Sequence, residues 1–243
     1  MIPKIIHYCW FGNGQLPELA VRCIDSWTKF LPDYKIIVWN EQNFDVNSYR
    51  FSSEAYKERK FAFVSDVCRL HALREMGGIY LDTDVEFLKP LSEDILTGNA
   101  FTGFEDNLLL SSAIMGSVKD GKWVVDLLSY YSDRSFYLAD GKLDTNPNTE
   151  IITAFMKEKK GIQINNTFQE IEGYCAIYPS DYFCPKSWKT LKVSITENTY
   201  CIHHFAGSWI HDSDQSTVGK LANKLLGKRI ANYLSEKYRK LKG

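Results

Sequence analysis

Residues 65–84 read SDVCRLHALREMGGIYLDTD, and this stretch decides the fold that the sequence predicts. Its first part has apolar residues at helical spacing, and the pair Gly77-Gly78 then supplies a stop for the helix. A short apolar strand over residues 79–81 follows at once and ends in Asp82-Thr83-Asp84. A strand that follows a helix and ends in acids places carboxylates at the carboxyl edge of a parallel sheet, where open α/β sheets bind ligands.

The chain on either side of this stretch alternates between strand and helix signals. The expected strands cover residues 4–8, 35–39, 99–104, 108–115, 174–178 and 199–203, and the expected helices cover residues 19–30, 53–76, 122–131 and 149–157. This alternation predicts an α/β fold with a mostly parallel central sheet. Because no internal repeat or Pro/Gly-rich linker divides the sequence, we expect a single domain over residues 1–243, closed by a basic amphipathic C-terminal helix over residues 219–243.

The bulk composition excludes several classes of protein. Lys and Arg number 29 against 30 acidic residues, and this net charge of −1 argues against a dedicated nucleic-acid binder. The N-terminus lacks a charged region followed by a long apolar stretch, so it predicts neither a signal peptide nor a membrane span. The six cysteines are scattered without a CxxC pair and are expected to be reduced and buried, which favours a cytoplasmic location.

Asp82 and Asp84 are candidate ligands for a hard divalent cation. Two acids separated by one residue face the same side of a strand, and at a strand end they can hold one ion through oxygen atoms. Mg²⁺ or Mn²⁺ held in this way keeps open positions for a diphosphate and acts as a Lewis acid. Such a pair alone also occurs on solvated loops, so the interpretation depends on the residues around it.

The whole of residues 65–84 resembles the DXD sugar-binding region of the GT-A glycosyltransferases. The group that it resembles, glycosyltransferase family 32, includes the yeast initiating α-mannosyltransferases and bacterial capsular polysaccharide transferases, and the clostridial glucosylating toxins are more distantly similar. The group's pattern, S-D-x-x-R-x-x-x-L-x-x-x-G-G-x-Y-x-D-x-D, is met at every fixed position. Residues 2–10, IPKIIHYCW, resemble its opening strand, and residues 203–209, HHFAGSW, resemble its closing segment. The resemblance therefore implies a GT-A, Rossmann-like fold.

The same resemblance implies roles for individual residues. Asp84 is expected to be the principal metal ligand, Asp82 to contact metal and ribose, and His204 to be the third metal ligand. Asp66 and Arg69 are expected to hold the donor sugar and its phosphates and, with the two acids, to form the catalytic set. The other expected donor-binding residues are Tyr8 and Trp10 beside the base, Tyr80, and Ser208 and Trp209 over the diphosphate.

The spacing of Asp66 and Arg69 allows two interpretations. They lie three positions apart on the predicted helix and so share a face. An arginine suits bidentate contact with a phosphate or a carboxylate. The alternative is a surface ion pair that stabilises the helix by about 0.2–0.5 kcal/mol.

By this resemblance, the predicted function is that of a retaining glycosyltransferase that uses Mn²⁺ or Mg²⁺. It is expected to move a hexose or N-acetylhexosamine from a nucleotide sugar, with a UDP sugar favoured, to a glycan or lipid-linked glycan acceptor of surface or capsular polysaccharide. Two alternatives stay open. One is a Mg²⁺-dependent phosphatase of the haloacid-dehalogenase type, which also places a DxD after an apolar strand, and the other is a catalytically inactive carbohydrate-binding module of the same fold.

The basic segment over residues 219–243 also has two interpretations. Its leucines, spaced among lysines, are typical of a solvated helix that packs on the domain. The second interpretation is an interfacial helix that makes peripheral contact with the inner face of the cell membrane.

Overall fold

The computed structural model of the chain describes residues 1–105 and 109–207, which include the compact unit Met1–Phe205. The basic helix predicted over residues 219–243 lies outside the described residues, as do Ser208 and Trp209. The single domain expected over residues 1–243 therefore stays a prediction.

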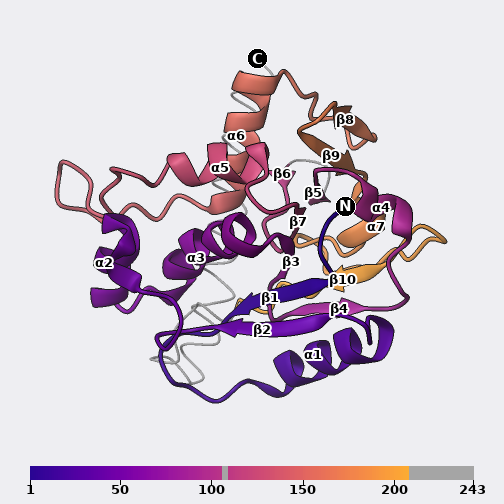
Figure 1. Ribbon diagram of the computed structural model, residues 1–243, viewed down its shortest axis with the longest axis horizontal. Helices are drawn as coiled ribbons and strands as arrows, with labels where there is room; N and C mark the ends of the chain where they lie inside the picture. Colours follow the sequence, from indigo (N-terminus) through magenta and orange to yellow (C-terminus); the bar gives the residue numbers. More distant parts are fainter. Residues whose placement is uncertain (106–108, 208–243) are drawn as a thin grey trace. The chain divides into compact units, whose positions relative to one another are not determined.

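A twisted sheet of mixed direction forms the centre of the α/β fold of this unit (Figure 1). Its strands lie in the order β2-β1-β3-β7-β5-β9-β8, with β6 paired to β5. Their bounds are β1 (Ile5–Cys9), β2 (Lys35–Trp39), β3 (Gly78–Leu81), β5 (Ala100–Glu105), β6 (Leu109–Leu110), β7 (Ile114–Ser117), β8 (Gln169–Ile171) and β9 (Cys175–Tyr178).

The strand directions confirm the prediction of a mostly parallel sheet. β1 runs parallel to both β2 and β3, and β5 runs parallel to β9. Because β7 is antiparallel to β3 and also to β5, the strands β2, β1, β3, β5 and β9 all point the same way. The sequence did not predict that β7 runs against its neighbours.

Helices cover both faces of this sheet. The longer ones are α1 (Glu18–Phe30), α2 (Arg50–Lys57), α3 (Phe61–Met76), α5 (Lys122–Ser129) and α6 (Asn148–Lys160), and the short ones are η1 (Val46–Ser48), α4 (Glu93–Thr97) and α7 (Ser180–Phe183). One hydrophobic cluster joins the sheet to α3, α5 and α6, and a second joins it to α1, α4 and α7. In β3, Tyr80 belongs to the first cluster and Ile79 and Leu81 to the second, as alternation along a strand requires. None of the described helices is long and apolar enough to cross a membrane.

The strand expected over residues 108–115 is divided in the structure into β6 and β7. Between them, the backbone carbonyls of Ser111 and Ser112 accept hydrogen bonds from side chains instead of from a neighbouring strand. Thr102 Oγ1 donates to the carbonyl of Ser111 at 2.8 Å, and Arg69 Nη1 donates to the carbonyl of Ser112 at 2.6 Å. These contacts replace ladder hydrogen bonds and satisfy the buried backbone.

A separate two-stranded ladder follows Asp82-Thr83-Asp84. β4 (Val85–Phe87), which the sequence did not predict, pairs antiparallel with β10 (Cys201–His203). Helix α1 holds β4 in place, because Trp27 Nε1 donates to the carbonyl of Val85 at 2.6 Å and the amide of Phe87 donates to Ser26 Oγ at 2.9 Å. The chain leaving β3 is therefore fixed against a helix on one side and against β10 on the other.

The glycine pair between α3 and β3 has a backbone that other residues rarely adopt. Gly77 has φ of 64° and Gly78 has φ of 106°, and a Cβ on Gly78 would lie 2.6 Å from the carbonyl oxygen of Ile5. Buried His7 supports this turn, because its Nε2 donates to the carbonyl of Gly77 at 2.8 Å while its Nδ1 accepts from Trp39 Nε1 at 3.0 Å. Both ring nitrogens are thus used by the neutral imidazole, and burial lowers the pKa of His7 to about 4. The turn sets where β3 begins and so where the acids after it arrive.

Candidate active site

Asp82 and Asp84 lie where β3 ends and the chain turns into β4. The amide of Asp82 donates to the carbonyl of Ala113 at 2.8 Å, and the amide of Val85 donates to the carbonyl of Asp82 at 3.0 Å. This backbone turn brings both aspartates to the edge of the sheet, where their side chains are 28% and 14% exposed. The sequence-based placement of two carboxylates at this edge agrees with the structure.

The imidazole that joins the two aspartates is that of His203. Its Nε2 lies 3.4 Å from Asp84 Oδ1, and Asp82, Asp84 and His203 each offer a ligand atom within 4.8 Å of the others. Burial lowers the pKa of His203, but Asp84 and the other acceptors around it outweigh burial and raise the pKa well above its usual value. The acceptors around His203 therefore favour its protonated, positively charged form.

His204, which was expected to be the third metal ligand, has a different partner. Its Nε2 lies 2.7 Å from Glu86 Oε2, and its backbone amide donates to the carbonyl of Asp84 at 2.9 Å. Consecutive residues at a strand end point to opposite sides, so only one member of the pair can face the acids. The register of β10 on β4, with His203 opposite Val85, places the ring of His203 and not that of His204 beside Asp84.

Arg69 is the centre of a buried ionic network. Its Nη2 lies 3.0 Å from Asp66 Oδ1 and its Nη1 lies 3.4 Å from Asp82 Oδ1, while the guanidinium stands over the ring of Tyr80 at 4.6 Å. Only 5% of Arg69 and 8% of Asp66 is exposed, so the alternative of a solvated surface pair does not hold. Burial opposes the charge of Arg69, but Asp82, Tyr80 and Asp66 raise the pKa of its guanidinium and keep it a cation.

Burial raises the pKa of both acids of this network, Asp66 and Asp82. Desolvation raises the pKa of Asp66 to about 6 although Arg69 opposes the shift, and desolvation also raises the pKa of Asp82. Tyr80 donates its hydroxyl hydrogen to Asp82 Oδ1 at 2.8 Å. Arg69 and Tyr80 thus fix the orientation of Asp82, and their expected contact with the donor stays a prediction.

The two aromatic residues expected beside the base lie on and after β1, which neighbours β3. Tyr8 is half-buried and packs its ring edge-on against Trp27 with centroids 5.7 Å apart. Trp10 donates its indole hydrogen to the carbonyl of Gly14 at 2.6 Å. Their donor-binding role stays a prediction, and so does that of Ser208 and Trp209, which lie outside the described residues.

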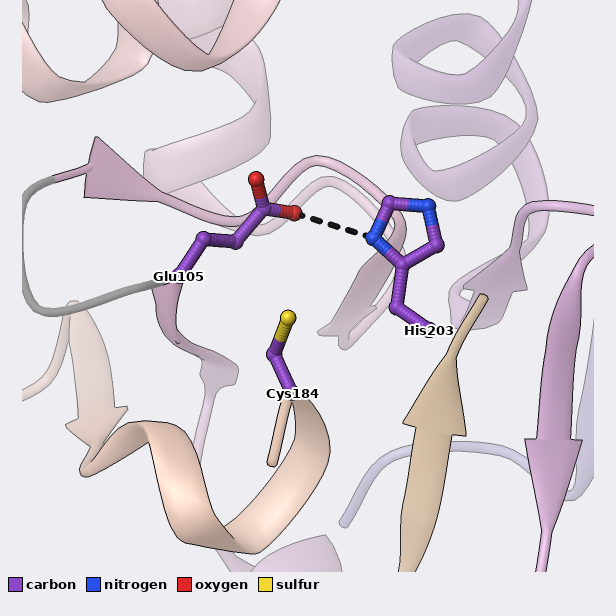
Figure 2. A group of neighbouring side chains, drawn as sticks. All are labelled: Glu105, Cys184 and His203. Carbon is purple, nitrogen blue, oxygen red and sulfur yellow. Dashed lines mark ion pairs between the residues drawn. The ribbon is translucent and has the colours of Figure 1, made fainter. Parts of the chain in front are cut away.

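Two residues on the other side of His203 were not predicted from the sequence. Glu105 at the end of β5 lies 3.4 Å from His203 Nδ1 through Oε1, and Cys184 follows α7 (Figure 2). The three side chains form a group whose ligand atoms all lie within 4.8 Å of one another. They come from three separate elements, so neither spacing nor periodicity could associate them, although the adjacent histidines were a visible signal.

Comparisons with known proteins concern the segment that carries Asp82 and Asp84. Residues 17–102 match the family described as the glycosyltransferase sugar-binding region containing the DXD motif. The chain is 24% identical over 198 residues to Subversion of eukaryotic traffic protein A of Legionella pneumophila, which is 68% of this chain and 30% of that protein. It is 35% identical over 88 residues to inositol phosphoceramide mannosyltransferase 3 of Schizosaccharomyces pombe, which is 35% of this chain and 24% of that protein.

The chain thus spans less than a third of the length of these two curated relatives. Among solved structures, that of the PaToxG glycosyltransferase is 18% identical, and the likeness covers 65% of this chain and 70% of that one with a TM-score of 0.49.

Proposed function

We propose, from the match of residues 17–102 to the glycosyltransferase sugar-binding region containing the DXD motif, that this chain transfers a sugar from a nucleotide-sugar donor to a glycan acceptor. One observation supports this proposal above the others. Asp82 and Asp84 leave the end of β3 and meet the ring of His203, which β10 brings beside them. Two carboxylates and one imidazole at the carboxyl edge of an α/β sheet are placed to receive a metal and a diphosphate.

The ligand atoms of Asp82, Asp84 and His203 fit a divalent cation such as Mn²⁺ or Mg²⁺. Carboxylate oxygens suit both ions, and the imidazole nitrogen favours Mn²⁺. Asp82, Asp84 and His203 are the residues that would hold the ion. When bound there, such a cation supplies Lewis-acid stabilisation of the negative charge on the leaving diphosphate. Glu105 faces His203 Nδ1 and favours the ring orientation that leaves Nε2 toward Asp84.

The other residues of the network act by orientation and charge. Arg69 and Tyr80 hold Asp82 at one oxygen, so that this carboxylate presents a fixed geometry to the ligand. The guanidinium also offsets part of the negative charge that Asp66 and Asp82 would otherwise place near a diphosphate. Catalysis of this kind is electrostatic stabilisation and positioning, and it needs no covalent nucleophile from the protein.

We extend the proposal to the stereochemistry and the substrates. The resemblance of residues 65–84 to family 32 supports transfer with retention, which yields an α-linked product from an α-linked donor. The donor is a hexose or an N-acetylhexosamine on a nucleotide, with UDP favoured, and the name of the fission yeast relative makes GDP-mannose the first competitor. The acceptor is a glycan or lipid-linked glycan of surface or capsular polysaccharide.

A hydrolysis screen of UDP and GDP sugars with Mn²⁺ or Mg²⁺ tests this proposal. Slow turnover of one donor is expected in the intact chain and not in Asp84→Asn, with the stereochemistry of the released sugar read by NMR. His203→Ala is expected to weaken Mn²⁺ binding, measured by electron paramagnetic resonance, at least about tenfold. The adjacent variant His204→Ala is the matched control and should keep the affinity of the intact chain.

Two results would contradict the proposal. Absence of donor hydrolysis and of nucleotide binding with every metal would favour a catalytically inactive module. Mg²⁺-dependent hydrolysis of p-nitrophenyl phosphate without turnover of any nucleotide sugar would instead favour the phosphatase alternative.

A further inference from the structure

We propose that Glu105, Cys184 and His203 form a second metal site, of the kind that binds Zn²⁺, on the side of the His203 ring that faces away from Asp84. The carboxylate and the ring point toward one another, and the sulfur of Cys184 is directed to the space between them (Figure 2). Thiolate, imidazole and carboxylate are the three ligand types that zinc takes in proteins. Three protein ligands leave a fourth position open to water or to a small ligand.

The distance between His203 Nδ1 and Glu105 Oε1 supports a metal more than a hydrogen bond. It is 3.4 Å, which is longer than the roughly 2.7–3.2 Å of N–H···O bonds. Nδ1 is also among the buried side-chain atoms that have no hydrogen-bond partner in the described part of the chain. With bonds of about 2.0–2.1 Å to nitrogen and oxygen, tetrahedral geometry separates two zinc ligand atoms by about 3.3–3.4 Å. The observed separation of these two atoms is therefore compatible with two ligands of one tetrahedral zinc ion.

The surroundings of the three side chains are those of a prepared site. Cys184 is 3% exposed and Glu105 is 8% exposed, so few waters compete for these ligands. Ser111 Oγ donates to Glu105 Oε1 at 2.7 Å and fixes the carboxylate, which is the outer contact that metal-binding carboxylates commonly have. Binding converts the Cys184 thiol to a thiolate and the His203 imidazolium to a neutral ring. Zinc–sulfur and zinc–nitrogen bonds form, and the two protons pass to solvent.

Because His203 belongs to both groups, the two metal sites compete. A neutral imidazole has one nitrogen with a free lone pair and one that carries hydrogen. If zinc binds Nδ1, then Nε2 carries the hydrogen and donates toward Asp84. Nε2 can then no longer be a ligand of the ion held by Asp82 and Asp84. Zinc at this site would therefore inhibit transfer. This competition depends on the proposed function, whereas metal binding by the three side chains does not.

Titration of the intact chain with Co²⁺ tests the site, because a cobalt–thiolate bond gives a charge-transfer absorption in the near ultraviolet that oxygen and nitrogen ligands do not. We expect this band to saturate at one equivalent and to disappear in Cys184→Ala. It should persist in Cys175→Ala, which removes another buried cysteine, and in Asp84→Asn, which disables only the other group. Zn²⁺ affinity, measured by calorimetry, should fall more than about 100-fold in Cys184→Ala, beyond the loss typical of an outer contact.

Absence of the thiolate band in the intact chain, or its persistence in Cys184→Ala, would overturn the site. If Cys184→Ala fails to fold by circular dichroism, Glu105→Gln provides the second variant, and an unchanged Zn²⁺ affinity there would also overturn it. A chain that binds Mn²⁺ without the thiolate band refutes this inference and leaves the proposed function standing. A chain that shows the thiolate band but hydrolyses no nucleotide sugar supports this inference and refutes the proposed function.

Discussion

Replacing His7 with glutamine removes the buried imidazole between Trp39 and Gly77 but keeps a side chain that can donate to the carbonyl of Gly77. In the folded chain the pKa of His7 is lowered by burial from 6.5 to about 4, so the ring is neutral at pH values where an unfolded chain would protonate it. The unfolded state therefore binds more protons between these two values. It follows that the contribution of His7 to the free energy of unfolding is complete above about pH 6.5 and is lost as the pH falls through about 4.

The size of this effect follows from the two pKa values. The interval from 6.5 to about 4, at about 1.36 kcal/mol for each pH unit, gives about 3 kcal/mol. Other groups titrate in the same range, so the useful quantity is the difference in free energy of unfolding between the intact chain and His7→Gln. On acidification from pH 7 to pH 4, that difference should move by about 3 kcal/mol against the intact chain.

Urea unfolding followed by tryptophan fluorescence at a series of pH values measures this difference. His204→Gln, which changes a histidine bonded to Glu86 outside the sheet, serves as a control for general effects of losing an imidazole. If the difference between the intact chain and His7→Gln does not change with pH, or moves in the other direction, His7 is not a buried neutral support of the glycine turn.

Asp66→Asn should show the opposite trend, because burial raises the pKa of Asp66 from 3.8 to about 6. The advantage of the intact chain over the variant in free energy of unfolding is complete below about pH 3.8 and falls by about 3 kcal/mol as the pH rises through 6. A difference that does not change with pH in the same urea series would refute this. Gly78→Ala should lower the free energy of unfolding by about 3 kcal/mol or more, since its φ is 106° and a Cβ would lie 2.6 Å from a backbone oxygen. Gly98→Ala, whose nearest atom lies 3.9 Å away, should stay within about 0.5 kcal/mol, and similar melting temperatures for the two variants would contradict the argument. Arg69→Met leaves the buried carboxylate of Asp66 and the partly exposed one of Asp82 without their cation, and it should cost about 3–5 kcal/mol in chemical denaturation. Arg69→Lys should recover part of that loss, and equal stability of the two variants would show that the charge is not what stabilises the fold.

The part of the site that is local in the sequence could be predicted. The helix stop, the short strand and the two acids are contiguous within residues 65–84, so the edge position of Asp82 and Asp84 follows from one segment. The pairing of Asp66 with Arg69 follows from helical spacing alone. Spacing could not predict the burial of these two side chains, because their burial depends on Tyr80 in β3 and on helix α5, which packs against α3.

The part of the site that depends on distant segments could not be predicted. The choice between His203 and His204 is made by the register of β10 on β4, and β4 is three residues long with no pattern of its own. The division of the expected strand over residues 108–115 has a similar origin. Its carbonyls are taken by Thr102 and Arg69, and such side-chain hydrogen bonds leave no trace in hydrophobic periodicity.

The pairing of β4 with β10 has a consequence for how the protein is made. Asp82 and Asp84 leave the ribosome long before His203, which completes their group only after β10 has added to β4. While residues 85–202 are being added, the nascent chain therefore carries the two carboxylates without their imidazole. A premature stop anywhere between residues 118 and 200 would give a fragment that has Asp82, Asp84 and the strands around them. Such a fragment lacks His203 and cannot assemble the group of three side chains. Assembly of these three side chains thus requires that translation has passed residue 203.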